Sequence, residues 1–144
     1  MVAGTILVQS FSVISLFDSG ASRCFISTRL VKMHSIHYDD IDTQWKISTR
    51  NGIITTNRVC KSCHLEVCER KLSVDMFVID TSRYDMILGR PWLSKYHVMI
   101  ACRSKSMIFR ILYLLEFQFF GKSKASRQEQ QGNYSTIEAQ ELYL

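Results

Sequence analysis

The sequence predicts a mostly β domain with one or two short helices. Short apolar segments rich in β-branched and aromatic residues recur at close intervals, whereas segments with helical spacing are few and short. The pair Asn51-Gly52 is a strong signal for a two-residue hairpin turn. Hydrophobic residues make up 47% of the 144 residues, which is typical of a globular protein and too high for a disordered one.

The N-terminal third predicts a hairpin followed by a helix. Apolar runs over residues 5–8 and 11–17 flank Gln9-Ser10, a pair suited to a tight turn. Residues 25–33 have helical spacing, with Ser22 or Ser27 as the N-cap. The acidic segment 39–42 predicts a solvated turn.

The middle of the chain predicts further short strands around one helical turn. Trp45 and Ile47 alternate with polar neighbours, as in a strand with one buried face. Pro91 favours a helical turn over residues 92–96, because a missing N–H costs nothing at the start of a helix. Further strands and short apolar runs are predicted over residues 53–59, 65–67, 72–79, 84–89, 98–100 and 107–111.

Composition divides the chain into a folded domain over residues 1–120 and a polar tail or linker over residues 121–144. The tail has no hydrophobic periodicity, so it cannot bury enough surface to offset its ordering entropy. The net charge is +5, but the basic residues are scattered, which does not favour a nucleic-acid site. The most apolar stretch, 107–120, contains charged residues and is too short to span a membrane.

Five cysteines are present, and the first residues lack the basic segment of a secretory signal. Reduced thiols in the cytoplasm are therefore expected rather than a disulfide framework. Cys60, Cys63, His64 and Cys68 lie close in sequence, but His64 directly follows Cys63, which does not fit the spacing of a zinc knuckle. We therefore expect no metal or cofactor. A Cys–His protease stays an alternative, although nothing selects one pair.

Asp18-Ser19-Gly20 carries the predicted chemistry. A carboxylate directly follows an apolar strand, a hydroxyl lies beside it, and a glycine permits a tight loop. If two such carboxylates face each other they share one proton, so that one activates a water while the other polarises a carbonyl group. The same triplet also occurs in ordinary turns, so it decides nothing alone.

Residues 16–27, LFDSGASRCFIS, resemble the active-site strand and following helix of aspartic proteases encoded by gypsy-type LTR retrotransposons. Residues 84–93, YDMILGRPWL, are similar to the second signature of that family, a hydrophobic–hydrophobic–glycine run followed by a short helix. Residues 96–102 resemble its closing strand. The resemblance covers nearly all of residues 1–112 in the same order.

This resemblance implies a closed retropepsin-like acid-protease β fold that cleaves polypeptide substrates, here a retroelement polyprotein. One Asp-Ser-Gly triplet per chain implies a homodimer that shares two Asp18 carboxylates. Ser19 and Gly20 would support the catalytic loop, and residues 49–53 would form a flap over the substrate. The residues expected to line the substrate cleft are Ala21, Ser22, Asn51, Gly52 and Ile87.

Two positions depart from the family pattern. Ser22 stands where retroviral relatives carry an acidic residue, and Ala101 stands where related elements carry an Asp. A second hypothesis is therefore a catalytically silent dimerisation or peptide-binding module with the same fold. A basic nucleic-acid-binding module is a third hypothesis, which the scattered charge does not favour.

Overall fold

The computed structural model describes residues 1–49, 52–81, 84–101, 103–111 and 116–121. Except for Gly121, the predicted tail lies outside these residues. The elements are β1 (Val2–Val8), β2 (Phe11–Phe17), β3 (Phe25–Ser27), α1 (Thr28–Met33), β4 (Asp39–Thr49), β5 (Gly52–Val67), β6 (Arg70–Ile79), β7 (Met86–Leu88), α2 (Arg90–Lys95), β8 (Val98–Ala101), β9 (Ser106–Phe109) and β10 (Phe117–Phe120). No helix among the described residues is long and apolar enough to cross a membrane.

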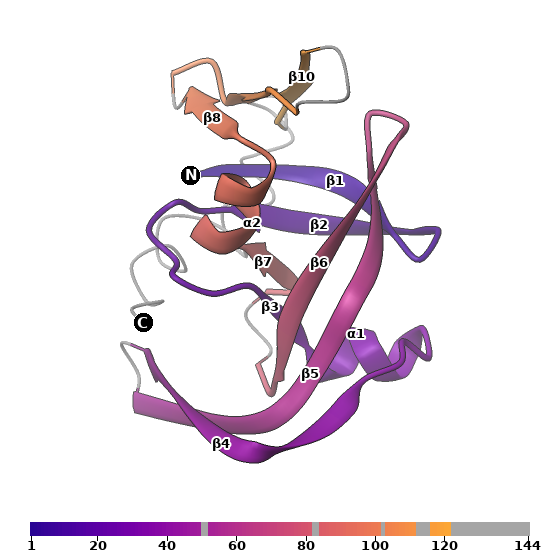
Figure 1. Cartoon of the computed structure of the whole chain (residues 1–144), viewed down its shortest axis with the longest axis vertical. Helices are drawn as coiled ribbons and strands as arrows, with labels where there is room; N and C mark the ends of the chain where they lie inside the picture. The colour runs from indigo at the N-terminus through magenta and orange to yellow at the C-terminus, as the bar shows by residue number, and fades with distance from the viewer. Residues whose placement is uncertain (50–51, 82–83, 102, 112–115, 122–144) are drawn as a thin grey trace.

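The main sheet closes into a barrel of six strands (Figure 1). Its strand order is β1-β2-β7-β3-β6-β5-β4, and a further pairing between β1 and β5 joins the ends. That pairing aligns Leu7 with Glu66 and Val8 with Leu65. β4 lies outside the closed ring and forms a long hairpin with β5. The mostly β, closed fold with two short helices is confirmed.

The predicted N-terminal hairpin is confirmed and sets the position of Asp18. β1 and β2 pair over their whole length, from Val2 opposite Phe17 to Val8 opposite Phe11. Gln9 and Ser10 both have positive φ, 50° and 75°, which suits the strand twist at a two-residue turn. The alternation of β2 therefore ends with a buried Phe17, and Asp18 follows directly at the end of the strand.

β7 is inserted between β2 and β3, which come from the first fifth of the chain. It runs parallel to β2, with Leu16 opposite Ile87, and antiparallel to β3, with Phe25 opposite Ile87. Met86, Ile87 and Leu88 are fully buried. A strand covered on both faces reads as a continuous apolar run, which explains why this segment shows no alternation.

The prediction of a helix over residues 25–33 is wrong for its first three residues. Residues 25–27 form β3, which pairs with β6, and the helix α1 begins at Thr28. Pairing with the barrel outweighs local helical spacing here, because Phe25 and Ile26 are fully buried between two strands. The N-cap is Ser27, whose Oγ accepts a hydrogen bond from Leu30 N at 3.1 Å.

The predicted acidic turn over residues 39–42 is also wrong, because it forms the first part of β4. Asp39 and Asp40 pair with Val59 and Arg58, and Arg58 Nε lies 3.6 Å from Asp40 Oδ1. The ladder then shifts register between Asp40 and Trp45. Similarly, the separate strands predicted over 53–59 and 65–67 are one strand, β5, with an irregularity between Cys60 and Cys63.

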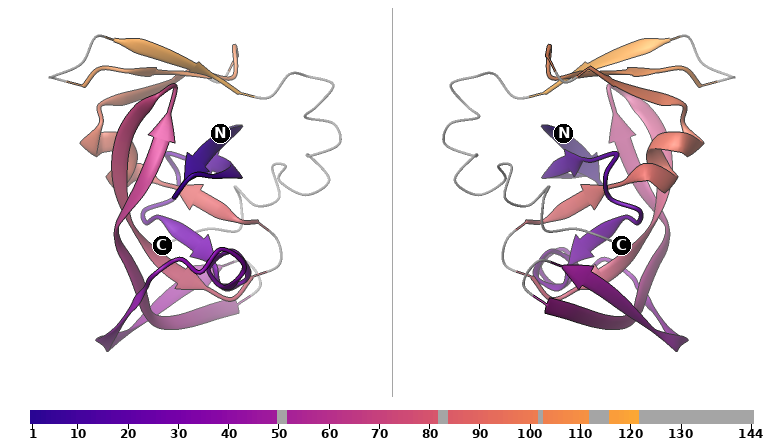
Figure 2. Two further views of the ribbon diagram at one scale, coloured as in Figure 1. Left: turned by 90° about the vertical axis from the view of Figure 1, so that its right-hand side faces the viewer. Right: turned by 90° about the vertical axis from the view of Figure 1, so that its left-hand side faces the viewer.

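A second, three-stranded sheet closes one end of the barrel. β8, β9 and β10 pair in sequence order, and Figure 2 shows this sheet lying across the barrel end. β10 was not predicted. An aromatic cluster joins the two sheets: Trp92 lies 5.7 Å from Phe109 and 6.0 Å from Phe17, and Phe119 lies 5.4 Å from Phe17, measured between ring centroids.

Trp92 is the centre of this cluster and is 2% exposed. We expect Trp92→Ala to lower the free energy of unfolding by about 3–5 kcal/mol, because it removes a buried indole and leaves a cavity. Trp92→Phe should cost less, since it keeps a ring and removes an indole N–H that has no hydrogen-bond partner among the described residues. Urea unfolding of the three proteins measures both effects, and equal losses in the two variants would contradict this account.

Candidate active site

Asp18 lies at the tip of β2, where backbone hydrogen bonds fix its loop. Its N–H donates to Leu88 O at 3.0 Å, and its carbonyl oxygen accepts from Ala21 N at 3.1 Å. The Gly20 N–H donates to Asp18 Oδ1 at 2.8 Å. These bonds draw the chain into a tight loop around the carboxyl group.

The carboxyl group of Asp18 is buried, at 7% exposure for the residue. Its second oxygen, Oδ2, has no hydrogen-bond partner among the described residues. Buried polar atoms are almost always paired, because an unpaired one costs about 1–3 kcal/mol. A buried carboxylate oxygen without a partner is therefore a feature that a purely structural aspartate does not explain, and it is available to a ligand, a water or a second chain.

The segment after β7 holds the loop from behind. Arg90 N donates to Ala21 O at 2.8 Å, and Gly89 N donates to Cys24 Sγ at 3.3 Å. A Cβ on Gly89 would lie 2.4 Å from Arg23 O and 2.5 Å from Ala21 O. The glycine that ends the second signature is therefore required by close approach of two backbones.

Two of the predicted cleft residues lie beside Asp18 in a small apolar cluster. Ala21 and Ile87 are both fully buried there, apart from the main core. The cluster consists of Leu16, Ala21, Phe25, Ile47, Ile79, Tyr84 and Ile87. Ile47 comes from β4, so the cluster joins the loop after Asp18 to the hairpin formed by β4 and β5.

The remaining predicted cleft residues are more dispersed. Ser22 is half-buried, and Ser19 and Gly20 are exposed at the loop. Gly52 opens β5 opposite Thr49 with φ 127°, so the predicted hairpin forms, but Asn51 lies outside the described residues. The assignment of these residues to a substrate cleft stays a prediction.

One contact near the site was missed by sequence reasoning. Arg29 on α1 forms an ion pair with Asp85, just before β7, and Asp85 O accepts a hydrogen bond from Ser27 N at 2.9 Å. This pair fixes the entry to β7 against α1. The two residues lie 56 positions apart, so no local pattern reveals the contact. Arg90, by contrast, has an exposed side chain.

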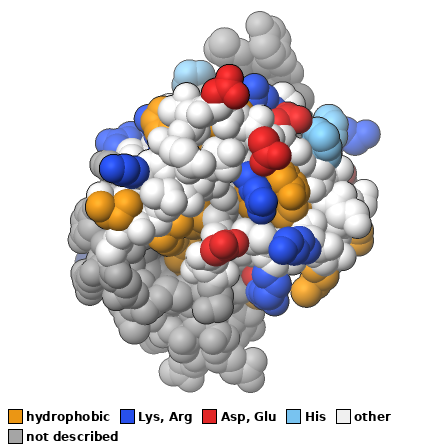
Figure 3. Space-filling model, turned by 90° about the horizontal axis from the view of Figure 1, so that it is seen from below, with side chains coloured by type: hydrophobic (Ala, Val, Ile, Leu, Met, Phe, Trp, Pro, Cys, Tyr) orange, Lys and Arg blue, Asp and Glu red, His pale blue; other side chains and the backbone are white. Residues whose placement is uncertain are grey.

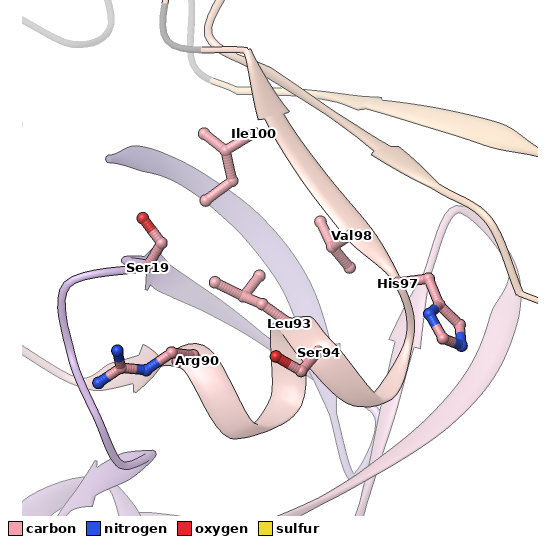
Figure 4. A pocket seen from close by; sticks show the side chains of 7 residues that line it. All are labelled: Ser19, Arg90, Leu93, Ser94, His97, Val98 and Ile100. Atoms are coloured by element: carbon pink, nitrogen blue, oxygen red, sulfur yellow. The ribbon is translucent and has the colours of Figure 1, made fainter.

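A pocket of about 460 Å³ lies on the other side of the catalytic loop, between the loop, α2 and β8 (Figure 4). Ser19, Leu93 and Ile100 surround its centre, whereas His97 points away from it. Among the described residues β8 pairs only with β9, so its other edge has unpaired backbone groups beside Ser19.

The described cysteines are poor candidates for a nucleophile. Burial raises the pKa of the Cys24 and Cys63 thiols, and burial together with the neighbouring Cys63 raises that of Cys60 to about 12. These thiols are therefore protonated at neutral pH, and the thiolate is the reactive form. On β5, Cys60 and Cys63 are buried while His64 is exposed. No group of three potential metal ligands gathers among the described residues.

Comparison with known proteins agrees with this geometry. The family described as retroviral aspartyl protease matches residues 1–112. The retroviral protease-like domain of Ddi1 from Leishmania major superposes with a TM-score of 0.64 at 14% identity, covering 86% of this chain and 95% of that one. The EIAV protease in complex with the inhibitor HBY-793 superposes with a TM-score of 0.57 at 18% identity, covering 69% of this chain and 90% of that one. No curated protein matches in sequence.

Gly89→Ala tests the packing of the two backbones behind Asp18. We expect it to lower the free energy of unfolding by about 1–3 kcal/mol, because the loop and α2 must separate to admit a methyl group. Urea unfolding measures this loss. Gly132→Ala, in the predicted polar tail, is the control and should leave the unfolding midpoint unchanged. A Gly89→Ala protein as stable as the parent would show that the two backbones are not held in contact.

Proposed function

Because this chain belongs to the retroviral aspartyl protease family, we propose that it is an aspartic endopeptidase whose active form is a homodimer. The observation that carries the proposal is the Asp18 carboxyl group, buried at the end of β2 with one oxygen bound by Gly20 N and the other unpaired. A rigid loop presents this group, and an apolar cluster lies beside it.

The proposed reaction uses two Asp18 side chains, one from each copy, that share one proton. The ionised carboxylate takes a proton from a water, and the water oxygen attacks the carbon of the scissile carbonyl. The protonated carboxyl group donates its proton to the carbonyl oxygen. When the tetrahedral intermediate collapses, the C–N bond breaks and the amine leaves with a proton from the carboxyl group that had received it from the water. One hydroxyl group of the intermediate returns its proton to the other carboxylate, which restores the pair with one shared proton.

The proposed contact between the two copies lies near the pocket beside Ser19. A two-fold axis that brings two Asp18 residues together must pass close to Ser19, the next residue in the chain. Val98 and Ile100 of β8 line this pocket and are only partly buried. Pairing of the free edge of β8 with a second chain would satisfy its backbone groups and cover these side chains.

The proposed substrate is an extended polypeptide, in particular a retroelement polyprotein. The apolar cluster is itself buried, and the partly buried Ile54 and Phe77 that pack against it offer apolar surface for substrate side chains. Ile47 of the β4–β5 hairpin belongs to the cluster, so the hairpin lies over it. The sequence resemblance to retrotransposon proteases supports the polyprotein. Because Ser22 and Ala101 depart from the family pattern, a silent peptide-binding or dimerisation module stays an alternative. The following variant distinguishes this module from a protease.

Asp18→Asn keeps the size of the side chain but removes the base and the shared proton. We expect hydrolysis of an unfolded protein substrate to fall by about a hundred- to ten-thousand-fold. Asp80→Asn, in the triplet Asp80-Thr81-Ser82 that lacks a glycine, is the matched control and should keep full activity. Equal turnover in parent and Asp18→Asn protein would reject the mechanism, and a folded, peptide-binding parent that never hydrolyses would establish the silent module.

Activity per subunit should fall on dilution, because the dimer dissociates into subunits that each carry one carboxyl group. Adding a tenfold excess of Asp18→Asn chain should reduce the activity of the parent to about a tenth, as most parent subunits then sit in mixed dimers. Ile100→Asp, on β8, should shift the mass in solution towards the monomer. Constant activity per subunit together with a monomeric mass would exclude a shared site.

A further inference from the structure

A second pocket of about 340 Å³ lies between the far end of the catalytic loop and the base of the β4–β5 hairpin. Its floor is apolar and includes Ile41, Trp45 and Phe77, and Arg23 and Lys61 lie at its rim. None of these residues has a role in the proposed reaction. Trp45 is 38% exposed, so part of its ring is accessible at this surface.

This pocket adjoins the apolar cluster beside Asp18, because Phe77 lines the pocket and packs against that cluster. Trp45 and Ile47 are two residues apart on β4, so their side chains lie on the same face of the strand. Ile47 belongs to the cluster, and the Phe77 ring lies 5.3 Å from that of Trp45. A peptide lying along β4 past Ile47 would therefore reach this pocket.

Two basic side chains and one acidic side chain line the pocket, so the net charge of its described lining is positive. The Arg23 guanidinium lies 5.3 Å from the centre of the Trp45 ring, and neither Arg23 nor Lys61 forms an ion pair among the described residues. The acidic residue, Asp75, accepts a hydrogen bond at Oδ1 from Ser62 N at 2.7 Å and offsets one of the two positive charges. Figure 3 shows hydrophobic side chains on the face seen from below, where β4 and β5 lie, with Lys and Arg as well as Asp and Glu side chains beside them.

We propose that this pocket selects peptide substrates that carry a glutamate at one position outside the scissile bond. Its methylene stem would pack on Trp45 and Phe77, and its carboxylate would reach Arg23 and Lys61. Trp45 holds the guanidinium in place, which reduces the entropy lost on binding. Side chains two residues apart in an extended peptide lie about 7 Å apart on one face. The selected residue therefore lies about two positions beyond the one nearest Ile47.

The inference rests on the proposed function, and cleavage of short peptide pools is its first test. All peptides of one pool carry the same residue, Glu, Gln or Lys, at one chosen position. Separate pools place this residue at each position along the peptide in turn. The parent protein should cleave the Glu pools at one position about tenfold faster than the Lys pools, and the difference should shrink as salt is added. Arg23→Glu and Lys61→Glu should abolish or reverse this preference, and cleavage of pools with Gln at that position should change much less than cleavage of Glu pools.

Lys46→Glu is the matched control. Lys46 is exposed and lies next to Trp45 on β4, so its side chain points to the opposite face while the change in net charge is the same. The control should keep the preference for Glu. If Lys46→Glu changes selectivity as much as Arg23→Glu does, the effect is one of overall charge and the pocket is not a subsite.

Binding to Asp18→Asn protein separates this inference from the proposed function, because it needs no hydrolysis. The same pools are titrated while tryptophan fluorescence is followed; Trp45 is partly exposed and the other tryptophan, Trp92, is buried. Glu pools should bind about tenfold tighter than Lys pools, and Arg23→Glu should remove the difference. Glutamate-dependent binding without cleavage by the parent would leave the inference standing and reject the protease. Cleavage without any preference for Glu would overturn the inference alone, and the absence of both would overturn both.

Discussion

The hydrogen bond from Asp18 N to Leu88 O is the contact on which the arrangement of this site depends. It joins the end of β2 to the end of β7, and the remaining loop contacts follow from it. Once the two strand ends are level, Ala21 O lies in reach of Arg90 N and Gly89 must pass against the loop without a side chain. The orientation of one carboxyl group is thus set by backbone atoms, which have no rotamers to lose.

The two apolar clusters hold together different parts of the barrel. The main core, centred on Trp92 and the aromatic residues of β9 and β10, fixes the barrel end and its cap. The smaller cluster, around Ile87 and Ile47, lies between the catalytic loop and the hairpin.

Sequence reasoning found the motifs and the β class because both depend on local patterns. The Asp18 triplet, the run ending at Gly89 and the turn at Gln9-Ser10 are short signals with direct physical causes. It failed where tertiary contacts decide: residues 25–27 pair with β6 despite their helical spacing, and residues 39–40 join β5 despite their charge. The pair between Arg29 and Asp85 and the pocket around Trp45 combine residues that no local window contains.

The insertion of β7 between β2 and β3 has a consequence for the order of assembly. Cys24 and Gly89, which bond behind the catalytic loop, are 65 positions apart. Contacts between segments so distant along a chain form slowly, because the long loop between them must close first. A chain emerging from the ribosome that has been made only as far as β6 carries Asp18 but has no Leu88 to hold it. The loop after Asp18 therefore takes its shape only after Leu88, Gly89 and Arg90 have been made, and until then the aspartate is an ordinary side chain at the end of a hairpin.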